Sequence, residues 1–262
     1  MVTPNDDNLH SELACVRDWF ESDLGQQVVA TEQAILDQLL TTYFGYHLLQ
    51  VSPYPHAICG SSPIQNKMNL ALIEGDSGVL RANPYHLPFE DDSLDVAVLH
   101  HALDFVDKPQ ELLREISRVV LPMGRLVMVG FNPFSLWGAW KLIARYGRRP
   151  PWNAAFIRPD RLMDWMNLLN FKIDRAQYCH YGLPLSRHGR EVPDFSKGLS
   201  RNANLPVGGV YVIVAQKHVG TMTQIRPAWR RRENRAFGQL SVVRSASRDI
   251  ISRRDTNDSP KD

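Results

Sequence analysis

The sequence predicts an α/β protein built on a mostly parallel sheet. Residues 94–99 and 126–129 are two apolar runs without alternation, which is typical of strands buried on both faces. Between them, an apolar face recurs at helical spacing over Leu112, Leu113 and Ile116. A strand, a crossover helix and a second strand make a βαβ unit, so the two strands should lie parallel.

The N-terminal part is expected to be helical. Trp19, Phe20 and Leu24 begin an apolar pattern, which continues at helical period over residues 25–42. We predict one broken and one continuous amphipathic helix that pack against the sheet. The first strand is predicted at residues 47–51.

The next strands are short. Residues 68–73 can form the second strand, and residues 79–81 a third one. The crossover helix should begin with Asp107 as its N-cap, because Gln110 stands in the capping-box position and Pro109 falls in the first turn. Pro122 and Gly124 are expected to end this helix.

After the βαβ unit, further elements follow in regular order. Ser135 is a suitable N-cap for a helix over residues 136–146, and Pro159 opens another helix. Residues 171–178 and 207–216 are the last two predicted strands.

Composition favours a soluble globular protein. The chain has 262 residues, 44% of them hydrophobic and 22% charged, and no apolar run has the ~18 residues of a membrane span. The polar and acidic N-terminus is not a signal peptide. Cys15, Cys59 and Cys179 are scattered, without a CxxC pair, which fits buried thiols in a cytoplasmic protein and argues against a cysteine-based zinc site.

Charge and periodicity indicate three regions. We predict an N-terminal helical extension at residues 1–44, a main domain at residues 45–218 and a basic, disordered tail at residues 219–262. The tail holds nine arginines and one lysine against five acidic residues, a net charge of +5. Such a tail favours nucleic acid as a candidate partner, although a solvated tail is the alternative. The oligomeric state cannot be read from the sequence.

About fifty residues carry a specific resemblance. The series is Leu87-Pro88-Phe89, an acidic turn, Ser93-Leu94-Asp95, an apolar strand, a Leu-Leu-Arg-Glu helix and the run from Arg118 to Gly124. This series resembles the type-11 group of class I S-adenosylmethionine (SAM) methyltransferases. A small bacterial subgroup of that group is also similar at Tyr46-His47-Leu48-Leu49 and at residues 130–133 and 168–171.

The resemblance implies a fold and a cofactor. The fold is the Rossmann-like class I methyltransferase fold, α/β, with a seven-stranded, mostly parallel sheet in the order 3-2-1-4-5-7-6 and the last strand antiparallel. The segment from Ser52 to Gly78 has only 27 residues, whereas a complete helix–strand–helix segment needs about 40, so we expect shortened helices around strand 2. The implied cofactor is SAM, and the methyl acceptor is not identified.

The cofactor loop departs from the pattern of the group. Gln50 stands where an acidic residue is usual, and Ser52 and Tyr54 stand where glycines are usual. At the adenine position, Asn83 could still accept a hydrogen bond, whereas Pro84 has no N–H to donate.

The resemblance and the strand ends together select the candidate site. Ser52, Glu74, Asn83 and His100 are the predicted cofactor contacts, with Glu74 as the carboxylate for the ribose hydroxyls and a turn residue as its alternative. His101 is the candidate catalytic base. Packing under a loop is the alternative for both histidines. No third ligand stands at a recognisable spacing from the histidine pair, so no metal site is predicted.

Two features near the end of the sheet have alternatives. Trp137, Trp140 and Trp152 could cover a planar substrate or pack in the core. Asn132-Pro133 is similar to part of the Asn-Pro-Pro-aromatic motif of amino-methylating enzymes, but it follows the fifth strand instead of the fourth, so that role is not assigned.

Three functions remain open at this point. The first is a SAM-dependent methyltransferase, which acts mainly by aligning the acceptor with an activated methyl group. The second is a catalytically inactive binding module on the same fold. The third is an RNA-directed protein that uses its basic tail.

Overall fold

The computed structural model describes residues 15–54, 56–72, 80, 82–144, 151–182, 184 and 205–218. The chain divides into two compact units, Met1–Thr221 and Met222–Asp262, and all described residues lie in the first. The predicted tail, Glu74 and most of the predicted strand 79–81 lie outside the described residues. The predicted domain boundaries therefore stay predictions.

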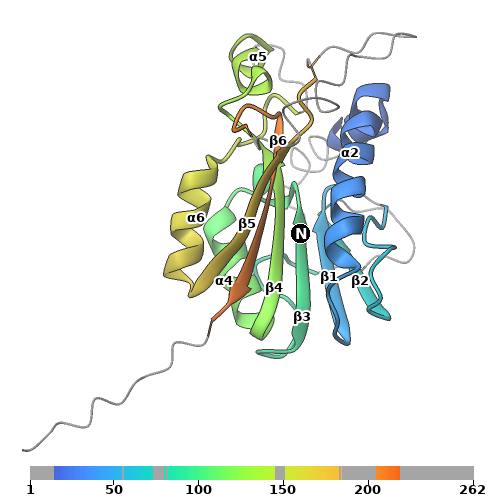
Figure 1. Cartoon of the computed structure of the whole chain (residues 1–262), viewed down its shortest axis with the longest axis vertical. Helices are drawn as coiled ribbons and strands as arrows, with labels where there is room; N and C mark the ends of the chain where they lie inside the picture. Colours follow the sequence, from blue (N-terminus) through green and yellow to red (C-terminus); the bar gives the residue numbers. More distant parts are fainter. Residues whose placement is uncertain are drawn as a thin grey trace, which may run out of the picture. The chain divides into compact units, whose positions relative to one another are not determined.

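Helices and strands are interspersed along the described part of the chain (Figure 1). Residues 15–21 are helical and lead into the first helix of the series. The elements are α2 (Asp23–Leu40), β1 (His47–Ser52), β2 (Asn66–Ala71), β3 (Leu94–His100), α3 (Ala102–Phe105), α4 (Pro109–Val119), β4 (Val120–Phe131), α5 (Leu136–Ala144), α6 (Pro159–Leu168), β5 (Phe171–Cys179) and β6 (Val210–Lys217).

The described strands form one six-stranded sheet in the order β2-β1-β3-β4-β6-β5. The first four strands are parallel, and β6 runs antiparallel between β4 and β5. The expected order and the antiparallel entry of the last strand are confirmed. Of the strand expected at residues 79–81, the structure describes Leu80, which forms a parallel bridge with Leu70 at the edge of the sheet.

Helices cover both faces of the sheet (Figure 1). Successive residues of a strand point to opposite faces, so Leu48 and Val96 join the core under α2, whereas Leu49 and Ala97 join the core under α4 and α6. This two-sided burial explains the continuous apolar runs in the sequence. No helix forms in the described residues between β1 and β2, in agreement with the expected shortening around strand 2.

At its start, helix α2 lies very close to the backbone of the helical residues that precede it. Ser22 is its N-cap and accepts a hydrogen bond from the Gly25 N–H group at 3.2 Å. A Cβ atom on Gly25 would lie 2.2 Å from the carbonyl oxygen of Trp19. Glycine is therefore required for the helical residues 15–21 to approach α2 this closely.

Several predicted details are corrected by the structure. The N-cap of α4 is Lys108 and not Asp107, because Pro109 disfavours the helical conformation at the residue before it. Pro122 and Gly124 were expected to end the helix, but α4 ends at Val119, and both residues lie inside the long strand β4, next to a register shift. The N-cap role of Ser135 is confirmed, since its Oγ accepts from the N–H of Gly138 at 3.3 Å.

Two of the three thiols are buried as expected. Cys59 and Cys179 lie in the core, and burial raises the pKa of both thiols, whereas Cys15 is exposed. Among the described residues, no helix combines the length and the apolarity of a membrane span.

Candidate functional site

The candidate site lies where the parallel strands β1 and β3 end. Ser52 is the last residue of β1 and His100 the last residue of β3, and neighbouring parallel strands end at the same edge of a sheet. The Ser52 Oγ atom lies 2.9 Å from Nδ1 of His100. The structure therefore brings together two residues that the sequence predicted.

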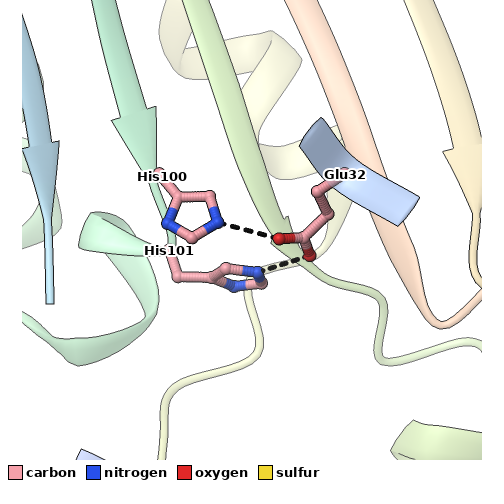
Figure 2. Close-up of side chains that lie close together, drawn as sticks. All are labelled: Glu32, His100 and His101. Atoms are coloured by element: carbon pink, nitrogen blue, oxygen red, sulfur yellow. Dashed lines mark hydrogen bonds and ion pairs between the residues drawn. The ribbon is translucent and has the colours of Figure 1, made fainter. Parts of the chain in front are cut away.

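Helix α2 adds a third side chain, Glu32. Its two carboxylate oxygens lie 2.8 Å from Nε2 of His100 and 2.8 Å from Nε2 of His101 (Figure 2). All three side chains are fully buried. Glu32 lies between Val28 and Leu36 on the buried stripe of α2, at a spacing of one helical turn. A glutamate in an apolar stripe is the sequence signal that marks it as a buried polar residue.

Asp104 extends the cluster. Its Oδ2 atom lies 3.0 Å from Nδ1 of His101 and accepts a hydrogen bond from the Phe131 N–H group at 3.0 Å. Its Oδ1 atom is buried and has no hydrogen-bond partner within the described part of the chain. His101 has φ of 50°, a left-handed conformation that non-glycine residues adopt rarely and that is common at functional sites. We call Glu32, His100, His101 and Asp104 the histidine–carboxylate cluster.

The electrostatics of the cluster follow from burial and from close opposite charges. Burial would raise the pKa of Glu32, but the charge of His101 and hydrogen bonds from both histidines lower it to about 2. Burial would lower the pKa of His101, but Glu32 and Asp104 raise it to about 9. Burial lowers the pKa of His100 and raises that of Asp104. Glu32 and His101 thus form an ion pair beside a neutral His100.

Aromatic rings enclose the cluster. The ring of Phe20 lies 5.8 Å from that of His100 and 5.6 Å from that of His101, and the Phe131 ring lies 4.1 Å from that of His101. Tyr54 is 7% exposed and packs against Phe20 at 5.6 Å. The polar groups therefore interact in a dry environment, where charge interactions are strong.

Gln50 organises the loop that follows β1. Its side-chain amide donates to the His56 carbonyl at 2.9 Å and accepts from the Ile58 N–H group at 2.9 Å. The backbone of Tyr54 donates to Ser52 Oγ at 2.9 Å. These side-chain contacts hold a loop that lacks the expected glycines.

The predicted cofactor residues can be tested for their fit to SAM. Ser52, His100 and His101 are fully buried and hydrogen-bonded within the protein, so they offer no free donor or acceptor to the methionine end of the cofactor. Asn83 is exposed, and its Oδ1 accepts from the Tyr85 N–H group at 2.9 Å, whereas its amide nitrogen has no hydrogen-bond partner among the described residues. The predicted residues therefore fit the adenosine end of SAM better than its methionine end. Glu74 lies outside the described residues.

Asn132 has a structural role that the sequence left open. Its amide nitrogen donates to the carbonyls of Pro206 and Gly208 at 3.0 and 2.9 Å, and its Oδ1 accepts from Phe134. The side chain is fully buried and fastens the end of β4 to the start of β6. Of the tryptophans, Trp137 is buried and stacks on Phe131, so it belongs to the core, whereas Trp140 is 37% exposed.

Replacing Asn132 with alanine should lower the free energy of unfolding by about 2 kcal/mol. The change leaves the buried Gly208 carbonyl without its partner, together with the part-buried Pro206 carbonyl and Phe134 N–H group. Urea unfolding followed by circular dichroism measures the loss. The exposed Asn153 provides the control, since Asn153→Ala should change stability by less than about 0.5 kcal/mol. Equal stabilities of the two variants would contradict the structural role of Asn132.

Comparisons with known proteins agree with the fold. Residues 38–128 match a family model described as a methyltransferase domain. Uncharacterized protein YafS of Escherichia coli (strain K12) is 35% identical over 190 residues, which are 72% of this chain and 75% of that protein.

Solved structures of methyltransferases share the architecture. A SAM-dependent methyltransferase from Thermotoga maritima superposes with a TM-score of 0.54 at 21% identity, over 76% of this chain and 93% of the other. A SAM-dependent methyltransferase from Archaeoglobus fulgidus gives a TM-score of 0.50 at 19% identity, over 71% and 93% of the two chains. At these identities the likeness shows the fold alone. Strand order, family model and the relative from Escherichia coli together show that the chain belongs to the class I methyltransferase family.

Proposed function

We propose that this chain is a SAM-dependent methyltransferase whose acceptor is not identified. The observation that carries the proposal is the family's sheet, with its parallel strands and antiparallel β6 in the family's order, in a chain of that family. The cofactor supplies an activated methyl group, and the protein's part is to align the acceptor with it.

The proposal places the adenosine end of SAM at the carboxyl end of β2. Asn83 is exposed there, close in the chain to Leu80, which pairs with β2. Its amide can donate to a ring nitrogen, and Glu74 remains the predicted partner of the ribose hydroxyls. We place the methionine end away from the histidine–carboxylate cluster, because Glu32 and both histidines there are already hydrogen-bonded within the protein.

Calorimetry with SAM and with its demethylated product tests the proposal on the full chain. We expect binding in the micromolar range, weakened roughly tenfold by Asn83→Ala, which corresponds to the loss of one hydrogen bond. Asn66→Ala is the matched control, because Asn66 is exposed at the opposite end of β2, and it should bind as the unaltered protein does. If SAM at high micromolar concentration gives no binding heat while circular dichroism shows an intact fold, the proposed methyltransferase activity is rejected.

One observation favours a second candidate, an inactive binding module. Tyr54 occupies the loop where the family usually has a glycine, and its ring is buried against Phe20 and 4.9 Å from the ring of His56. A ring packed there reduces the room near the end of β1. A folded protein that binds neither SAM nor its product would support this second candidate.

A further inference from the structure

The two histidines and Glu32 form a group of three potential metal ligands. Their candidate ligand atoms, two imidazole nitrogens and a carboxylate oxygen, all lie within 4.8 Å of one another. The residues come from α2 and from the end of β3, 68 and 69 positions apart in the chain. We propose that Glu32, His100 and His101 bind a divalent transition-metal ion such as Zn²⁺.

The ligand types and their spacing fit such an ion. Two histidines and one carboxylate are a known ligand set for zinc and for Fe²⁺. With metal–ligand bonds of about 2.0–2.2 Å and tetrahedral angles, neighbouring ligand atoms stand roughly 3.4 Å apart. Each Nε2 atom now lies 2.8 Å from a carboxylate oxygen of Glu32, so an outward shift of about half an ångström at each contact would admit the ion.

Both rings point their Nε2 atoms toward Glu32 (Figure 2). Each ring also has an outer partner on its other nitrogen. Nδ1 of His101 faces the carboxylate of Asp104 at 3.0 Å, and Nδ1 of His100 faces Ser52 Oγ at 2.9 Å. Metal-binding histidines usually donate their second N–H group to such an acceptor, which fixes the ring and leaves the first nitrogen free for the ion. The cluster thus has inner and outer contacts in the arrangement of a metal site.

The charges of the cluster also favour a cation. Glu32 and Asp104 bring two fully buried carboxyl groups to the cluster. A divalent ion with two neutral imidazoles would balance both carboxylates, and uncompensated buried charge is costly.

Such an ion would join α2 to the sheet. Three ligands from two elements far apart in sequence can be held together by one ion, and its binding energy then contributes to folding. Phe20 and Phe131 enclose the ligands, which restricts solvent access. The inference does not depend on the proposed methyl transfer.

Metal analysis of the full chain tests the site. Protein purified without chelator should contain about one equivalent of zinc or iron by mass spectrometry. Protein stripped with EDTA should take up one equivalent of added Zn²⁺ and melt at a higher temperature than the stripped form. Stripped protein that takes up no Zn²⁺, with its melting temperature unchanged by Zn²⁺, would overturn the inference.

Variants locate the ion. Glu32→Gln, His100→Gln and His101→Gln should each lower the bound metal at least tenfold. His56→Gln and His86→Gln are matched controls, because both histidines are exposed, and they should retain the full equivalent. Full metal content in all three cluster variants would place the ion elsewhere and refute the site.

X-ray absorption on the unaltered protein loaded with Zn²⁺ does not depend on how the variants fold. We expect two imidazole nitrogens and one or two oxygens at about 2.0–2.2 Å. A sulfur shell near 2.3 Å would assign the zinc to cysteine and overturn the inference.

Discussion

Replacing Glu32 with glutamine should lower the free energy of unfolding of the metal-free protein by about 3 kcal/mol. In the absence of an ion, the Glu32 carboxylate accepts hydrogen bonds from both histidines in a fully buried site. Glutamine keeps the size of the side chain but removes the charge, and its NH₂ group then faces an imidazole nitrogen. The buried charge of His101 would keep only Asp104 as its partner, or His101 would lose its proton.

Urea unfolding in the presence of EDTA measures this effect without any contribution from bound metal. Glu21→Gln is the matched control, since Glu21 is exposed just before α2 and its neutral variant should stay within about 0.5 kcal/mol of the unaltered protein. A loss below about 1 kcal/mol for Glu32→Gln would show that the cluster contributes little to stability.

A double-mutant cycle isolates the interaction energy between Glu32 and His101 from the energies of their other contacts. The losses of unfolding free energy from Glu32→Gln and from His101→Gln should not be additive, because each change already removes the same 2.8 Å contact. We expect a coupling energy of at least about 1 kcal/mol. Additive losses would mean that the two side chains do not stabilise the fold through one another.

The sheet was largely predictable from the sequence, because strands buried on both faces leave apolar runs. Residues 94–99 and 126–129 stood out for this reason, and their strands β3 and β4 lie side by side as expected. The length of β4 was not predictable in the same way. Pro122 and Gly124 indicate a turn locally, but the backbone accommodates both at a register shift within the strand.

The site was predictable only in part. Ser52 and His100 could be placed together because β1 and β3 are parallel neighbours. Glu32 could not be placed there, since its contact depends on how α2 is rotated and packed on the sheet, which no local pattern determines. The predicted roles of His100 as a cofactor contact and of His101 as the catalytic base assumed an open crevice, whereas α2 and Phe20 cover both histidines.

Replacing Phe131 with alanine should cost about 3–5 kcal/mol of unfolding free energy, the largest effect expected from a single truncation in the core around the cluster. The Phe131 ring is fully buried and lies within 5.8 Å of the rings of Trp19, His101, Trp137 and Phe156. The backbone N–H group that donates to Asp104 is retained in the variant, so the loss reports the ring alone.

Phe134→Ala provides the comparison, because it deletes the same atoms three residues further along the chain from a side chain that is 60% exposed. It should cost less than about 1 kcal/mol, since little apolar surface is removed from water there and its stacking on Arg158 is a surface contact. Urea unfolding with an unchanged slope would assign the difference to the native state. Similar losses for the two variants would contradict the central position of Phe131, and with it the packing that joins the N-terminal helices to the histidine–carboxylate cluster.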